Sequence, residues 1–212
     1  MIVPNQQWNV VLPQYLLDPE KGRIKKGLSQ FIDPDERGKE RVYDDFYLEA
    51  SKEHFMQGDL LHSIKTIEWD AEKTDYFSAY TPAMLVSNSC DVAFENKRLL
   101  DKEALFAPVV SLNEYFDDLK GAGKTTEQIQ TIYSKLKQQE YTNLFYLPAN
   151  KINGKEYIVF LDKICWYPIS EMHKKLEQIK TEKFLSLSDW AFYLFITKIA
   201  FHFCRVPEEK ER

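Results

Sequence analysis

Cysteine and glycine are scarce in this sequence. Its three cysteines, Cys90, Cys165 and Cys204, stand far apart and never form a C-x-x-C pair. Such cysteines are typical of a reducing compartment and argue against a disulfide framework or a zinc site. Only 7 of the 212 residues are glycine and 9 are proline, whereas 44% are hydrophobic and 14% aromatic. This composition favours one packed globular domain with additions over a disordered chain.

Positive charge, long apolar runs and metal-ligand patterns are scarce as well. The 28 lysines and arginines stand against 33 aspartates and glutamates, so a nucleic acid would need a local basic patch against the overall sign. No apolar run is long enough to span a bilayer, and the N-terminus does not have the pattern of a signal peptide. We therefore expect a cytoplasmic protein without membrane contact. Because His54, His62 and His173 lack ligand spacing, we expect neither a metal nor another cofactor.

Strand-forming runs predict a small sheet. One run follows Gly58 and reaches Trp69, and a second begins at Pro82, where a missing N–H does no harm at the start of a strand. Further runs of strand length cover residues 105–112, 143–147 and 156–166. The turn-forming residues 151–154 lie between the last two runs and predict a hairpin.

Helical patterns interrupt and follow these runs. Residues 113–120 and 125–140 predict two helices around a glycine break, and Thr125 with Gln128 fits a capping box at the second. One face of this second helix is apolar, through Ile129, Ile132, Tyr133 and Leu136. Residues 170–181 predict a short helix. Ser186 or Ser188 is expected to cap a last helix that runs to about Arg205 and is apolar almost all round, so that it is either buried or an interface.

Five strands with these helices predict an α+β fold based on a small SH3-like β-barrel. We expect the barrel over residues 56–182, with a helical insertion at 113–140. We expect residues 183–212 to form the C-terminal helix and tail. Residues 1–55 alternate short apolar groups with charged, proline-containing turns, which is typical of an extension that lies across a domain.

The order of these motifs resembles the PemK/MazF-like toxin family. Gly58-Asp59-Leu60 is similar to the Gly-Asp that opens the first strand of that family, and Thr-Pro-Ala-Met-Leu-Val-Ser-Asn at 81–88 to its Arg-Pro-Ala-Leu-Val-Leu-Ser-Asn. Residues 105–111 resemble its Val-Cys-Pro-Val-Thr-Ser strand, and residues 159–164 its Leu-Asp-Gln-Ile strand. The resemblance implies an SH3-like barrel, a homodimer, an antitoxin or other protein partner, and metal-independent cleavage of RNA.

The departures from the family fall where that chemistry should lie. Tyr80-Thr81 stand in place of its catalytic arginine, and Val110 matches its catalytic threonine, with Ser111 beside it. Metal-free cleavage needs a base for the 2′-OH and a cation for the phosphate, and threonine and valine supply neither. Two functions stay open. One is a toxin-type endoribonuclease with a relocated or degenerate active site, and the other is a non-catalytic protein- or nucleic-acid-binding module of a bacterial defence or regulatory system.

Two polar groups are candidate sites. Ser87, Asn88, Cys90 and Asp91 follow the second strand and, with Ser111, are candidate catalytic residues. The alternative is an Asx-type turn in which Cys90 packs inward. The second group lies at i, i+4 and i+7 on the last helix and is a candidate nucleic-acid or phosphate site, or else a solvated face that favours the helix C-terminus: Lys198, His202 and Arg205.

For two further patterns we favour a structural role over a functional one. Gly-Ala-Gly-Lys-Thr-Thr at 121–126 mimics a phosphate-binding loop, but Asp118 stands where the first glycine belongs, which favours a turn between helices. Four aromatic residues flank the first long loop, where packing in the core is favoured and stacking on bases is the alternative: Trp69, Tyr76, Phe77 and Tyr80.

Overall fold

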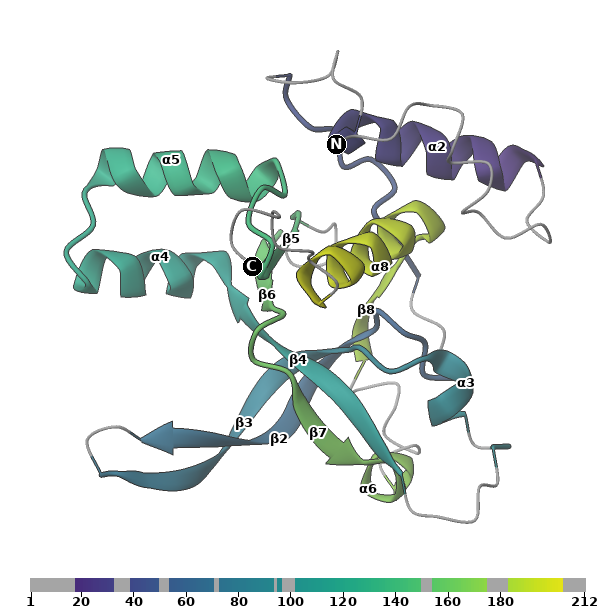
Figure 1. Ribbon diagram of the computed structural model, residues 1–212, viewed down its shortest axis with the longest axis vertical. Coiled ribbons are helices and arrows are strands. Elements are labelled where there is room, and N and C mark those ends of the chain that lie inside the picture. The colour runs from purple at the N-terminus through teal and green to yellow at the C-terminus, as the bar shows by residue number, and fades with distance from the viewer. Residues whose placement is uncertain are drawn as a thin grey trace, which may run out of the picture.

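The computed structural model describes residues 18–32, 39–49, 54–70, 73–93, 95–96, 102–149, 154–174 and 183–203. Within them one antiparallel sheet has the strand order β1-β8-β2-β3-β4-β6-β5, with β7 paired to β4 (Figure 1). The strands are β1 Tyr47–Leu48, β2 Leu60–Asp70, β3 Asp75–Leu85, β4 Glu103–Ser111, β5 Leu144–Leu147, β6 Tyr157–Phe160, β7 Cys165–Pro168 and β8 Lys183–Leu187. The helices are α2 Asp18–Ile32, α3 Ser89–Val92, α4 Leu112–Gly121, α5 Thr126–Lys137, α6 Ile169–Lys174 and α8 Asp189–Phe203.

The sheet curls, and side chains link the segment of β1 to the residues of β5 and just after it. The Tyr47 hydroxyl in β1 donates to the carbonyl of Pro148, just after β5, at 2.8 Å. Beside this bond the Phe46 and Phe145 ring centroids lie 6.3 Å apart. The Phe195 ring of α8 packs on the same Phe145 at 5.3 Å. The structure therefore confirms an α+β fold with a curled, barrel-like antiparallel sheet. The sheet takes β1 from the range expected to be an N-terminal extension, β2 to β7 from the range expected to be the barrel, and β8 from the range expected to be the C-terminal helix and tail.

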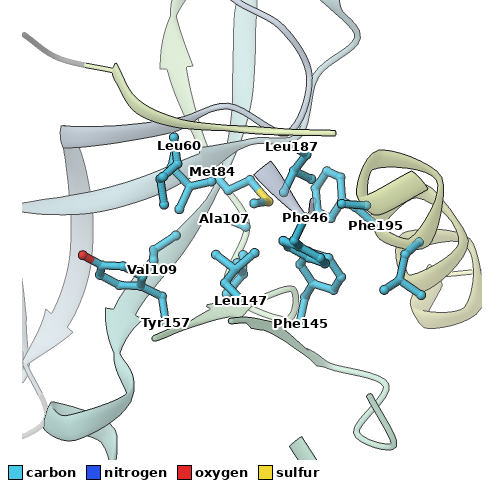
Figure 2. Packing of buried hydrophobic residues seen from close by; sticks show 14 of the residues in the cluster. Phe46, Leu60, Met84, Ala107, Val109, Phe145, Leu147, Tyr157, Leu187 and Phe195 are labelled. Atoms are coloured by element: carbon cyan, nitrogen blue, oxygen red, sulfur yellow. The ribbon is translucent and has the colours of Figure 1, made fainter. Parts of the chain in front are cut away.

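Two cores lie on opposite faces of the central strands. Met84 and Ala107 face the first core, where they meet side chains from both sheet edges and from α8 (Figure 2). Their neighbours Leu85 and Phe106 face the second core, under α6. This split follows from the strand period of two, because successive side chains point to opposite faces. A third cluster joins the α4–α5 hairpin to β5 and β6, through Leu112, Leu136, Leu144, Tyr146 and Ile158.

Local helix signals in the sequence are confirmed. Thr125 caps α5, and its side chain and that of Gln128 bond each other's backbone N–H groups. The residues before it form the predicted turn, in which Gly123 has a φ of 82°. α8 begins directly after Ser188, whereas Ser186 lies in β8. The last helix was expected to be either buried or an interface. Its first turns are buried, through Trp190, Ala191, Leu194 and Phe195.

The predicted start of the second strand at Pro82 is wrong. β3 begins at Asp75, so Pro82 lies inside the strand. The β2–β3 register shifts between Leu61 and Ile64, which places an irregularity of β2 opposite Pro82. A proline fits an interior position at such a bulge because no ladder hydrogen bond depends on its missing N–H.

The predicted strand over residues 156–166 is two strands. β6 pairs with the end of β4, where Val159 lies opposite Val109, and β7 pairs with its beginning, where Cys165 lies opposite Phe106. A turn at residues 161–163 separates them. β5 and β6 pair as the predicted hairpin, although residues 150–153 of its turn lie outside the described residues. α6 confirms the start of the short helix, and residues 175–182 also lie outside them.

Helix α2 packs directly on α8 (Figure 1). The contact is close at Gly27, where an added Cβ would lie 2.5 Å from Cδ2 of the Trp190 indole. Ile24 and Leu28 on the same side of α2 are buried in the first core. A glycine at this position therefore lets the helix approach the indole ring.

Replacing Gly27 by alanine is expected to lower the free energy of unfolding by about 1–3 kcal/mol, because the added methyl overlaps the Trp190 ring. The same change at Gly22, where a Cβ would meet nothing within 4 Å, is expected to raise it by about 0.5–1 kcal/mol through helix propensity. Urea unfolding measures both. Equal effects at the two glycines would contradict the packing of α2 on α8.

Candidate binding surface and predicted polar cluster

The predicted polar cluster after β3 forms a turn and a helix cap. Asn88 is the N-cap of α3, and its Oδ1 accepts the Cys90 N–H at 2.9 Å. The Ser87 hydroxyl accepts the Leu105 N–H at 2.8 Å, and the Ser89 hydroxyl accepts the Gln57 N–H at 2.9 Å. The Asx-type turn is thus present. These oxygens hold backbone groups and connect the segment to β4 and to the residues before β2.

Cys90 and Asp91 lie in the short helix α3. Cys90 is exposed, so the expectation that it packs inward is wrong. The residue of this helix that packs inward is Val92, which is buried in the second core. Asp91 is half-buried in the first turn.

Ser111 does not join the cluster. Because β3 and β4 are antiparallel, the end of β3 lies beside the beginning of β4, where Leu85 pairs with Phe106. Ser111 is the last residue of β4, roughly 20 Å along the strand from Leu105 at about 3.3 Å per residue. There it is the N-cap of α4, in a capping box with Glu114. The sequence contained this signal, since Glu114 follows Ser111 by three residues.

The predicted phosphate-binding residues of α8 have different surroundings. Lys198 is 7% exposed and donates from Nζ to the carbonyl oxygen of Gln139, so it does not belong to a solvated face. Burial lowers the pKa of Lys198 to about 8. The ring of His202 is half-buried beside Phe203, with centroids 4.8 Å apart. Arg205 lies outside the described residues.

Between pH 7 and roughly pH 9.5 the free energy of unfolding is expected to rise by about 2 kcal/mol through Lys198. Its folded pKa of about 8 lies below the usual lysine pKa of 10.5. Over this range the folded protein therefore loses the proton while the unfolded chain keeps it, so the stability rises with pH. Urea unfolding across the range measures the slope. The Lys198→Met variant is the control and should lack the rise, so a parallel slope in both proteins would contradict the burial of this ammonium.

Gln139 is an organising residue that the sequence did not indicate. It has a φ of 57° just after α5. Its side-chain amide donates to the Tyr146 carbonyl at 2.8 Å and accepts the Tyr146 N–H at 3.2 Å, as a neighbouring strand would. With the Lys198 bond, Gln139 joins α5, β5 and α8.

A buried ion pair fastens β8 to the start of β2. Lys183 Nζ lies 2.6 Å from Oδ2 of Asp59, and both side chains are 1% exposed. The Ser186 hydroxyl donates to the other Asp59 oxygen at 2.6 Å, and the Met56 N–H donates to Oδ2 at 2.7 Å. Burial raises the pKa of Asp59, and the Lys183 charge with these hydrogen bonds counteracts only part of the rise. The Gly-Asp motif therefore has a structural role here.

The distal half of the β2–β3 hairpin projects from the sheet (Figure 1). We call residues 64–70 and 75–81 the β-arm. In its register Lys65 lies opposite Tyr80, Ile67 opposite Ser78 and Trp69 opposite Tyr76. Directly opposite residues share a face of a ribbon, and we call the face with these pairs the tyrosine face. The opposite, acidic face carries the pairs Glu68 with Phe77 and Asp70 with Asp75.

Large apolar side chains are exposed on the β-arm. Ile67, Tyr76 and Tyr80 on the tyrosine face are 63%, 68% and 69% exposed, and Phe77 on the acidic face is 44% exposed. The favoured packing of Tyr76, Phe77 and Tyr80 in the core is therefore wrong. The reason is that β4 pairs with β3 only from Ala83 onward, so burial reaches only the base of the arm, at Ile64 and Thr66, which are 1% and 3% exposed.

Comparisons of this chain with protein-family models, with curated proteins and with solved structures find no significant match. The resemblance to PemK/MazF-like toxins therefore stays a prediction. In the described part of the chain no helix is long and apolar enough to cross a membrane. The same residues contain no group of three or more histidine, cysteine, aspartate or glutamate side chains placed to hold a metal ion.

Proposed function

We propose that this protein is a non-catalytic binding module that contacts its partner through the tyrosine face of the β-arm. The exposure of Ile67, Tyr76 and Tyr80 carries this proposal. Apolar and aromatic side chains gathered on one exposed face mark an interaction surface, and tyrosine is enriched in interfaces because its ring is large and its hydroxyl is polar. A two-stranded ribbon is only marginally stable in water, so a partner that covers the arm also stabilises it.

The hydrogen bonds of the polar cluster support binding over catalysis. A catalytic base or nucleophile must be available to the reacting group, whereas the side chains of Ser87, Asn88 and Ser111 accept backbone N–H groups. Lys198, the cation predicted for a phosphate, is buried in the fold. A toxin-type endoribonuclease would need its base and its cation elsewhere.

We also propose that the sheet is a divergent SH3-like barrel of the PemK/MazF type. Its curled antiparallel strands support this assignment, as does the position of Gly58-Asp59 at the start of β2, where Gly58 has a φ of 91°. Such a protein is expected to form a homodimer and to bind an antitoxin-type protein. In this proposal the scaffold is kept and the chemistry is not.

Incubation of purified protein with total RNA, without metal, tests the proposed function. We expect the RNA to stay intact, and growth of a bacterial host to continue when the protein is induced. The matched variant is Asp91→Asn, which keeps the size of the side chain and removes its charge. RNA cleavage by the natural sequence that this variant abolishes would overturn the proposal and restore the endoribonuclease.

A further inference from the structure

The outer edge of β3 is open along the β-arm. β3 pairs with β4 only from Ala83 to Leu85, so within the described residues positions 75–81 have no strand partner besides β2. The Tyr76 N–H is accepted by Oδ1 of Asp75 at 2.7 Å, which leaves positions 77–81 for a further strand. In an edge strand every second residue directs its N–H and C=O away from the existing ladder. An extended chain laid against this edge would therefore add one strand to the ribbon, with main-chain hydrogen bonds as the source of affinity.

The two faces of the β-arm call for different side chains in an added strand. Successive residues of a strand point to opposite faces, so every second side chain would lie on the tyrosine face and the others on the acidic face. Apolar side chains on the first would cover Ile67, Tyr76 and Tyr80, which are more than half exposed. Lysine or arginine on the second would meet Asp75, which is exposed.

The charge of the β-arm disfavours a nucleic acid. The hairpin contains Lys65 and Lys73 against the acids Glu68, Asp70, Glu72 and Asp75. Bases could stack on the tyrosine rings. A phosphate backbone, however, would be repelled by the excess of acids in the hairpin, because screening acts only over a Debye length of ~8–10 Å. A basic protein segment has the opposite preference, since acids attract it and tyrosine rings attract cations.

We propose that the β-arm binds an extended protein segment in which apolar residues alternate with lysine or arginine, added as a strand to the outer edge of β3. This inference rests on the proposed binding function and names the class of partner. Hydrogen bonds to residues 77–81 hold the segment, and the alternation of its side chains selects it.

Fluorescence anisotropy with a labelled peptide of about eight alternating valine and lysine residues tests the inference on the full-length protein. We expect saturable binding with a Kd of roughly 10–100 µM, together with slower hydrogen exchange at amides of residues 77–81. N-methylation of every second peptide amide removes donors to the edge without changing the side chains. It is expected to weaken binding by about tenfold or more.

Variants of the protein separate the two faces. Tyr76→Ser combined with Tyr80→Ser is expected to weaken binding by about tenfold or more, because it removes the apolar contact. Asp75→Asn is expected to weaken it about threefold, because it removes a charge and keeps the oxygen that accepts the Tyr76 N–H. Trp166→Ser is the matched control, since Trp166 is 54% exposed on β7, outside the arm. It should bind as the natural sequence does, and an unchanged melting temperature shows that each variant folds.

Three results would overturn the inference. The first is equal binding of a peptide whose valines and lysines are segregated into two blocks. The second is no saturable binding of the alternating peptide up to about 1 mM. The third is that the natural sequence binds labelled oligouridine but not the peptide, and that the double tyrosine variant loses the oligouridine binding. This last result would replace the partner class and leave the binding function of the arm standing.

Discussion

Replacing Lys183 by methionine is expected to lower the free energy of unfolding by about 3–5 kcal/mol, because it leaves the buried Asp59 carboxylate without its counter-charge. The ion pair is 1% exposed on both sides, so water does not replace the lost ammonium. Urea unfolding at neutral pH measures the loss. The matched control is Lys120→Met, because Lys120 pairs with Asp117 at 2.8 Å with both side chains more than half exposed. We expect it to change stability by less than about 1 kcal/mol.

The Lys183→Met variant should also acquire a dependence on pH. Lys183 lowers the pKa of Asp59, and burial raises it, so removal of Lys183 raises it further. A carboxyl whose folded pKa lies above its unfolded value contributes stability at low pH, and that contribution disappears as the pH rises through the folded pKa. The variant should therefore become less stable from about pH 4 upward relative to the natural protein. A further Asp59→Leu change is expected to restore most of the loss at neutral pH. A loss that persists unchanged in this double variant would show that packing, not charge, is responsible.

Replacing Phe46 by alanine is expected to cost about 3–5 kcal/mol, because the side chain packs the β1 segment on β5 and α8. Phe46 is 2% exposed. Its ring centroid lies 5.1 Å from that of Trp190 and 6.3 Å from that of Phe145. The cavity left by the ring would therefore weaken the packing of the β1 segment on both β5 and α8. The midpoint of urea unfolding measures the effect.

Leu48→Ala is the matched control for Phe46, two residues away in the same segment. Leu48 is 55% exposed, so we expect a change within about 0.5 kcal/mol. Equal losses in the two variants would contradict the burial of Phe46, and with it the packing of the β1 segment on β5 and α8.

Elements with local signals could be predicted from the sequence. The capping box of Thr125 and Gln128 joins residues three positions apart, and it fixed the start of α5. The apolar face of α5 was visible in the same way, through the helical period. β2 and β4 were found because their strand-forming runs are long. The capping box of Ser111 was equally local, but its serine was interpreted as a catalytic group.

Features that depend on distant residues could not be predicted. Asp59 and Lys183 meet across 124 positions, and Lys198 reaches Gln139 across 59. Neither distance leaves a pattern in one sequence. The exposure of Tyr76 and Tyr80 depends on where β4 leaves β3, and aromatic residues beside a strand otherwise favour burial. The separation of Ser111 from Ser87 likewise follows from strand direction, which the spacing of the two serines does not contain.

The place of β8 between β1 and β2 limits how early the sheet can be completed while the chain is synthesised. Tyr47 in β1 pairs with Leu187 in β8, about 140 residues later in the chain. At roughly 5–20 residues per second, β1 therefore waits on the order of 7–30 s after its synthesis for β8, its neighbour in the strand order. Until then Phe46 and the first residues of β2 have no β8 or α8 to cover them. A nascent chain stalled before Lys183 should accordingly be a substrate for chaperones.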